Sequence, residues 1–124
     1  MVIGTARDAA DLLEPLFAGA AGEKLAVLHL DRERRVIALD ERPLGSHEAV
    51  LLPMREIIDS ALRLGGEGLV IAHNHPSGDP RPSRADIDAT RRLAETAAQL
   101  GIQLHDHLIF AGGGCRSFRE LGLL

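Results

Sequence analysis

The amino-acid sequence predicts a single α/β domain in which helices flank one curved, mixed sheet. Short apolar runs typical of strands alternate with segments of helical periodicity, and no unit repeats along the chain. The chain has 124 residues, 45% of them hydrophobic, which is enough to bury one core. It contains three Phe but no Tyr or Trp, so aliphatic side chains must build most of that core. We expect residues 1–124 to form one domain without a linker.

The first part of the chain predicts a helix followed by a hairpin. Thr5 can cap a helix whose apolar face ends at Phe17, and Pro15 predicts a kink or an early stop just before it. The run Leu25–Leu30 is typical of a buried strand, with Val36–Leu39 as its partner. The turn between the two strands carries mixed charges, which indicates a solvated turn.

The middle of the chain predicts a second helix and a short strand. Residues 40–52 carry no pattern that assigns them, whereas Pro53 suits the first turn of a helix. The inner face of this helix would consist of Met54, Ile57, Ile58, Ala61 and Leu62. Three glycines then end the helix, and Leu69–Ala72 follows as a short apolar strand.

The last part of the chain predicts a loop, a long helix and two strands. The loop His73–Pro82 is rich in Pro and Gly, and Ser83 can cap a helix that ends near Leu100. Short strands are expected near Ile102–Leu104 and His107–Phe110, followed by a glycine turn and a tail. The inward face of the long helix would consist of Ile87, Thr90, Ala94 and Ala97.

Composition argues against several classes of function. A net charge of −4 and the scarcity of aromatic side chains disfavour nucleic-acid binding, which uses basic surfaces and stacking rings. The single cysteine, Cys115, cannot form an internal disulfide, and we expect an unreactive thiol in a reducing compartment. No stretch approaches the ~20 apolar residues of a membrane helix, and the first residues lack the charged-then-apolar layout of a signal peptide. We therefore expect a cytoplasmic protein with neither a membrane nor a nucleic-acid partner.

The residues that carry chemistry lie in one strand–loop–helix segment. His73 and His75 stand two apart where a strand ends, so both imidazoles can point to one side. Asp86 lies in the first turn of the following helix and can close a third ligand position. Two imidazoles and one carboxylate are typical of catalytic zinc sites, which keep a fourth position for water. The pattern predicts a zinc site at His73, His75 and Asp86.

Each part of this pattern also has a structural explanation. Ser83 and Asp86 form an N-capping motif on their own, and His-x-His pairs occur at many strand ends. Their combination at this spacing favours the metal site.

Other histidines and carboxylates are harder to place from the sequence. The second His-x-His pair, in residues 105–107, is better explained as structural. Asp106 or His107 could nevertheless orient a zinc-bound imidazole, and Asp79 is a further candidate for that role. His29 and His47 have no evident partner.

The same segment resembles the motif of a known enzyme family. His73, His75, Ser83 and Asp86 match the JAMM (MPN+, JAB) metalloprotease motif position by position. The longer string of residues 73–86 is similar to the RadC branch of that family, and the likeness extends from about Glu23 onward. Supporting matches are residues 55–57, 106–109 and 117–122.

The resemblance implies a JAMM/MPN-like fold, which is similar to that of cytidine deaminases, and a catalytic Zn²⁺. It also implies a glutamate as general base; spacing alone leaves Glu23, Glu41, Glu48 and Glu56 open, and the family layout points to Glu23. By the same resemblance, Ser83 would donate a hydrogen bond to the tetrahedral oxyanion. RadC-like proteins usually have an N-terminal helix-hairpin-helix region, for which we expect no room in this chain.

The function that we expect is zinc-dependent hydrolysis of a peptide or isopeptide by a metal-activated water. The substrate itself is not predicted, and the small chain leaves room for homodimer contacts. Two other hypotheses stay open at this point. One is a RadC-type accessory protein of DNA repair, and the other is a non-catalytic zinc-bearing interaction module.

Overall fold

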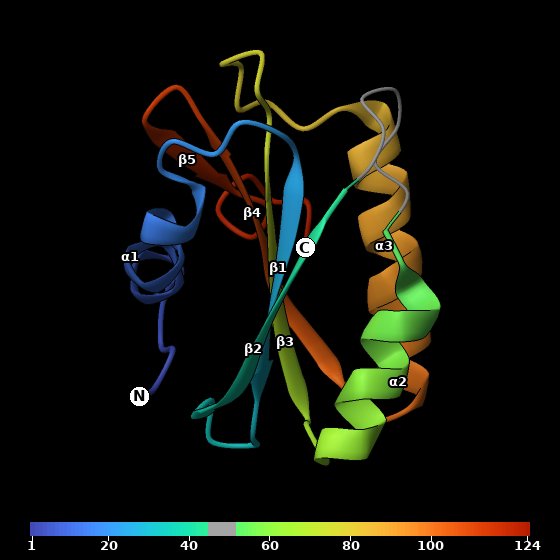
Figure 1. The fold of residues 1–124 in the computed structure, drawn as a ribbon. Coiled ribbons are helices and arrows are strands. Elements are labelled where there is room, and N and C mark those ends of the chain that lie inside the picture. Colours follow the sequence, from blue (N-terminus) through green and yellow to red (C-terminus); the bar gives the residue numbers. More distant parts are fainter. Residues whose placement is uncertain (45–51) are drawn as a thin grey trace.

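The computed structural model describes residues 1–44 and 52–124 and has one five-stranded mixed sheet between helices (Figure 1). The strand order is β2-β1-β3-β4-β5, with β3 and β4 parallel and all other neighbours antiparallel. The elements are α1 (Ala6–Phe17), β1 (Lys24–Leu30), β2 (Val36–Pro43), α2 (Met54–Leu64), β3 (Gly68–Asn74), α3 (Arg84–Gln99), β4 (Gln103–Ala111) and β5 (Gly114–Ser117). The predicted α/β class and mixed sheet are confirmed.

Helix α1 covers one face of the sheet, and α2 and α3 cover the other (Figure 1). The parallel pair β3–β4 needs a crossover connection, and α3 provides it. Strand β3 is buried along its whole length because both of its faces are covered. No helix in the described residues is long and apolar enough to cross a membrane.

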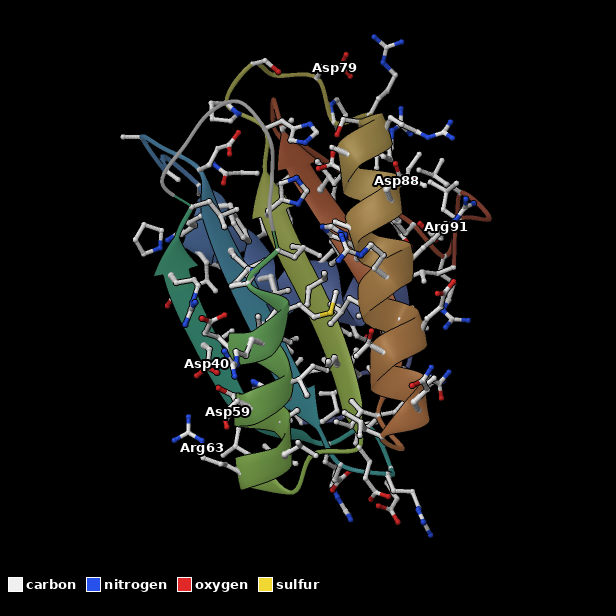
Figure 2. The ribbon with its side chains drawn as sticks, turned by 90° about the vertical axis from the view of Figure 1, so that its right-hand side faces the viewer. Asp40, Asp59, Arg63, Asp79, Asp88 and Arg91 are labelled. Carbon is white, nitrogen blue, oxygen red and sulfur yellow. The ribbon has the colours of Figure 1, made fainter. Side chains whose placement is uncertain are left out.

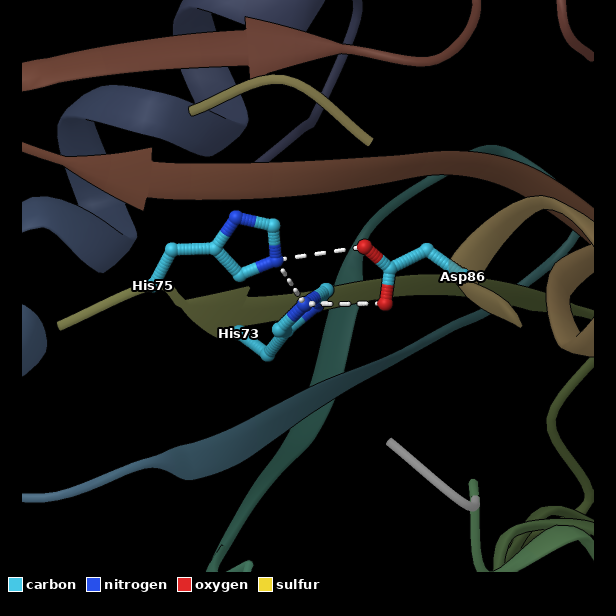
Figure 3. Close-up of side chains that lie close together, drawn as sticks. All are labelled: His73, His75 and Asp86. Carbon is cyan, nitrogen blue, oxygen red and sulfur yellow. Dashed lines mark hydrogen bonds and ion pairs between the residues drawn. The ribbon is translucent and has the colours of Figure 1, made fainter. Parts of the chain in front are cut away.

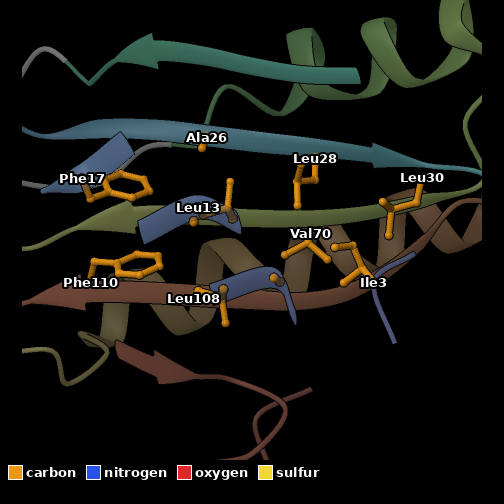
Figure 4. Packing of buried hydrophobic residues seen from close by; sticks show 11 residues of the cluster. Ile3, Leu13, Phe17, Ala26, Leu28, Leu30, Val70, Leu108 and Phe110 are labelled. Atoms are coloured by element: carbon orange, nitrogen blue, oxygen red, sulfur yellow. The ribbon is translucent and has the colours of Figure 1, made fainter. Parts of the chain in front are cut away.

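The core under α1 is built from alternate positions of the central strands. Leu28, Val70 and Leu108 pack against Leu13 of the helix, as Figure 4 shows. At one end of this layer the rings of Phe17 and Phe110 stack with their centroids 4.9 Å apart. The three phenylalanines of the chain therefore contribute to the core, although most of it is aliphatic as expected.

The opposite face of the sheet positions the histidine that ends β3. Leu69 and Ile71 pack in the core beneath α2 and α3. Side chains alternate along a strand, so His73 lies on this same face, at the end where α3 begins.

Both predicted N-caps are confirmed. Thr5 and Ser83 each form a capping box with the acidic residue three positions later. The predicted early stop before Pro15 is wrong, since α1 continues to Phe17. Proline removes only one backbone hydrogen bond there, and the burial of Phe17 against the sheet holds the last turn.

The strands differ from the prediction in extent and in number. Strand β3 includes His73 and Asn74, which were expected in the loop. Strand β2 runs to Pro43, into residues that the sequence left unassigned. Strand β5 was not predicted. The two strands expected around residues 102–110 are parts of the single strand β4. A β-bulge at His105 interrupts the regular alternation of its side chains, so the sequence pattern looks like two short strands.

The helix faces were predicted with two errors. Leu62 was assigned to the inner face of α2 but is 55% exposed, whereas Ile57 and Ala61 are buried. Leu93 was not assigned to the inner face of α3 but is fully buried. Of the other residues named from the sequence, His47 and Glu48 lie outside the described residues.

Replacement of the core residue Leu93 by Ala should destabilise the protein by about 2–5 kcal/mol, because it leaves a cavity between α3 and the sheet. The control Leu62→Ala, on the exposed side of α2, should change stability by less than about 0.5 kcal/mol. Urea unfolding followed by circular dichroism measures both. Equal losses in the two variants would contradict the burial of these helices.

Candidate metal centre

The three predicted ligands meet at one end of the sheet. His73 ends β3, His75 follows it immediately, and Asp86 lies in the first turn of α3, as Figure 3 shows. The two Nε2 atoms are 3.0 Å apart, and each lies close to the Asp86 carboxylate, at 3.4 Å for His73 and 3.1 Å for His75. One ligand atom from each residue lies within 4.8 Å of the others. The structure thus brings together the three residues that could hold a metal ion.

The local fold explains this convergence. The His75 N–H donates to the Phe110 carbonyl and so keeps His75 beside β4 after β3 has ended. The loop beyond it carries Asp79 past the end of the sheet and returns to the start of α3 (Figure 2). There the Ser83 N–H donates to Asp86 Oδ2 at 2.8 Å, and Ser83 Oγ accepts from the Asp86 N–H. The cap therefore does not compete with metal binding; it orients the ligand.

A buried chain of hydrogen bonds sets the proton position on His73. The Thr90 hydroxyl donates to the Asp86 carbonyl at 2.6 Å, so it must accept from His107 Nδ1, which lies 2.7 Å away. Burial lowers the pKa of His107 well below its ordinary value, so this imidazole is neutral and its Nε2 is an acceptor. His73 Nδ1 lies 2.7 Å from that nitrogen and must donate to it. The hydrogen at Nδ1 leaves Nε2 as the nitrogen of His73 that can offer a lone pair to the centre.

His75 is oriented in the same manner by the backbone of the loop. Its Nδ1 lies 2.8 Å from the carbonyl oxygen of Asp79, which can only accept, so Nδ1 carries the hydrogen. The Asp79 side chain instead pairs with Arg81, whose hydrogen bonds lower the Asp79 pKa to about 2. Nε2 is thus also the nitrogen of His75 that can offer a lone pair to the centre, and Asp79 contributes through its backbone.

Two lone pairs and a carboxylate at this separation require a cation. Asp86 is buried, and burial disfavours its charged form, but the interactions with His73 and with the Ser83 N–H outweigh burial and lower its pKa. Asp86 Oδ1 has no hydrogen-bond partner in residues 1–44 and 52–124. Ligands about 2.0–2.1 Å from a tetrahedral ion are separated by about 3.3 Å, close to the distances here. A proton on one imidazole or a metal ion satisfies this arrangement, and the two compete.

Glu23 is placed beside this centre by the strand ladders. Its carbonyl accepts from the Leu44 N–H, so the β1–β2 ladder continues past the first residue of β1. Leu25 pairs with His73, and Glu23 lies two residues earlier on that same face. Its Oε2 is buried and has no hydrogen-bond partner among the described residues.

Asn74 is a site residue that the sequence interpretation missed. Its Oδ1 accepts from the Lys24 N–H at 2.8 Å, and its Nδ2 donates to the Gly22 carbonyl at 3.0 Å. These two bonds hold the backbone on either side of Glu23 against the end of β3. The position of Asn74 between the two histidines was the only available signal.

The remaining candidates have structural roles. Asp106 accepts hydrogen bonds from the Ser117 hydroxyl and from two backbone N–H groups and faces away from the centre. His29, for which no partner was predicted, is buried and lies 3.0 Å from the Asp40 carboxylate. Of the other glutamates considered as bases, Glu41 pairs with Lys24 and Glu56 is exposed on α2. His107, in contrast, orients His73. The sequence had left this role open for either Asp106 or His107.

Comparison with known proteins agrees with this geometry. The family described as the RadC-like JAB domain matches residues 3–123. A UPF0758 protein of Rhodobacter capsulatus is 45% identical over 102 residues, covering 82% of this chain and 48% of the relative. A UPF0758 protein of Symbiobacterium thermophilum is 40% identical over 114 residues, covering 92% of this chain and 49% of the relative. A UPF0758 protein of Ruegeria pomeroyi is 43% identical over 102 residues, covering 82% of this chain and 46% of the relative. The chain spans about half the length of these relatives.

The hydrogen-bond chain from Thr90 to His73 can be tested through metal affinity. We expect the chain to bind about one Zn²⁺, and Thr90→Val to weaken binding roughly 10- to 100-fold, because His107 loses the acceptor that fixes its tautomer. The control Thr96→Val, on the same helix, should leave the affinity unchanged. Competition titration with a chromogenic chelator measures both. Equal affinities of Thr90→Val and the parent chain would contradict the assigned proton positions.

Proposed function

The chain belongs to the RadC-like JAB domain family, and from the geometry of its metal centre we propose that it is a zinc-dependent hydrolase of peptide or isopeptide bonds. The observation that supports this most directly is the pair of inward Nε2 atoms beside the Asp86 carboxylate, with each Nδ1 engaged elsewhere. Two imidazoles and one carboxylate form a donor set suited to catalytic zinc.

The ligand set leaves room for chemistry. His73, His75 and Asp86 would hold the ion through three bonds, with a net positive charge left on the site. When bound, zinc would polarise a substrate carbonyl and make water a nucleophile at neutral pH. The side chains around the ion would then control orientation and proton transfer.

Glu23 is suited to the role of general base. One of its carboxylate oxygens is buried without a hydrogen-bond partner in residues 1–44 and 52–124, on the face of the sheet that carries His73, and is suited to accept a proton. In the proposed reaction the water oxygen bonds to the carbonyl carbon while Glu23 takes the proton. The carbon–nitrogen bond then breaks, and Glu23 delivers the proton to the leaving nitrogen.

Ser83 is suited to stabilise the oxyanion. Its Oγ accepts from the Asp86 N–H, which leaves the hydroxyl proton available for a further bond. A hydroxyl fixed at a helix N-terminus can donate to the developing negative charge of the tetrahedral intermediate.

The general base can be tested by an isosteric change. Glu23→Gln should lower kcat about 10²- to 10⁴-fold and retain zinc, because it removes the proton acceptor and no ligand. A peptide and isopeptide library, with the zinc-loaded chain, supplies the substrate for this measurement. The control Glu41→Gln, on neighbouring β2, should keep full activity. If the parent chain binds zinc but cleaves nothing, the metal serves a non-catalytic module instead.

A comparison of the two capping boxes distinguishes an effect of Ser83 on stability from an effect on catalysis. Ser83→Ala and Thr5→Ala should each destabilise the protein by about 1 kcal/mol, because each removes an N-cap. Only Ser83→Ala should also lower kcat, by about 10²- to 10³-fold. Thermal unfolding and the cleavage assay measure the two effects. A Ser83→Ala variant with normal kcat would restrict Ser83 to capping.

A further inference from the structure

A cavity of about 590 Å³ adjoins the metal centre on the α1 side of the sheet. It lies between α1 and the β4–β5 hairpin, and we call it the α1 cavity. His75 and Pro76 line one end of it, so the imidazole of a metal ligand is also part of the cavity wall. No step of the proposed reaction uses this space.

Part of the wall of the α1 cavity is apolar and contains two aromatic rings, whereas the rest is polar. Phe17 and Phe110 line it, and their rings stack on each other (Figure 4). The Phe110 carbonyl accepts from the His75 N–H, which places these rings near His75. Ala10, Ala111 and Cys115 add further apolar surface. Such walls suit the aliphatic part of a long side chain.

The electrostatics of the cavity favour a positive charge. The charged residues in its lining are Arg7, Asp11 and Glu14, of which Arg7 and Asp11 pair with each other at 3.4 Å. Glu14 has no ion-pair partner in the described part of the chain, so the lining has one net negative charge. Lys24, which lies 5.9 Å from the Phe17 ring centroid, is paired with Glu41.

The end of α1 adds to this negative potential. The cavity is lined by residues 17–20, where the carbonyl end of the helix dipole lies. The last turn of α1 contains no basic residue that would offset the dipole. Glu14 also acts on Cys115, whose thiol pKa is raised to about 11, first by burial and then by the carboxylates of Asp106, Glu120 and Glu14.

We propose that the α1 cavity binds a lysine or arginine side chain of the substrate, close to the amide that is hydrolysed. This inference rests on the proposed function for its catalytic meaning, whereas the binding itself does not depend on catalysis. An extended polypeptide advances about 3.4 Å per residue, so a side chain one or two residues from the scissile amide can pass His75 into the cavity. Its aliphatic carbons would contact Phe110, and its charge would lie near Glu14.

The binding step is tested without any reaction. The zinc-loaded, ¹⁵N-labelled chain is titrated with Nα-acetyl-lysine methylamide and with Nα-acetyl-norleucine methylamide, which keeps the side-chain carbons of lysine but lacks the ammonium group. We expect the lysine probe to shift the amide signals of Ala18, Gly113 and Cys115 and the norleucine probe to bind more weakly. Glu14→Gln should weaken the lysine probe about 1.5- to 5-fold, as for an exposed ion pair. The control Glu95→Gln, on α3, should not change it.

Two outcomes of the titration overturn the proposal: equal binding of both probes, or no shift of the lining amides up to the solubility limit of the lysine probe. The cleavage library gives a separate reading. Cleavage without a preference for a basic residue within two positions of the scissile amide overturns the α1 cavity as a specificity site and leaves the hydrolase intact. Absence of all cleavage overturns the hydrolase, and the titration alone then decides whether the cavity binds cations.

Discussion

The interaction on which the site depends is the hydrogen bond from the Ser83 N–H to Asp86 Oδ2. It begins α3, fixes the rotamer of a metal ligand and compensates part of the cost of burying a carboxylate. Asp86 also accepts the Thr90 hydroxyl at its backbone, which ties the same residue to the chain of hydrogen bonds that ends on His73. The start of the helix and the candidate metal centre therefore share the carboxylate of Asp86.

A second constraint comes from the bulge at His105. Leu104 packs under α2 and α3, and in a regular strand residue 107 would point to the opposite face. The extra residue reverses the alternation, so that His107 reaches Thr90 while Leu108 packs under α1. The orientation of His73 thus depends on an irregularity in the neighbouring strand.

These two constraints explain what could be predicted from the sequence. The class of fold, both N-caps and the convergence of His73, His75 and Asp86 follow from local patterns, because each depends on residues close together in the chain. The single strand β4 could not be predicted, since a bulge has no distinctive residue pattern. The role of Asn74 was hidden for a related reason: its partners, Gly22 and Lys24, are about fifty positions away. Leu93 was missed because α3 carries charged residues on both sides of it, which obscures its apolar stripe.

The bulge also limits how the sequence can change over evolutionary time. Loops on the surface of a domain tolerate insertions and deletions, but the spacing between Leu104 and His107 lies inside a buried strand. Deletion of one residue there would remove the bulge and give a more regular strand. Every side chain between the bulge and the glycine turn would then point to the opposite face of the sheet. The phenylalanine that stacks on Phe17 and the histidine that supports His73 would then each lie on the wrong side of the sheet. Length, more than residue identity, is what this stretch of β4 must conserve.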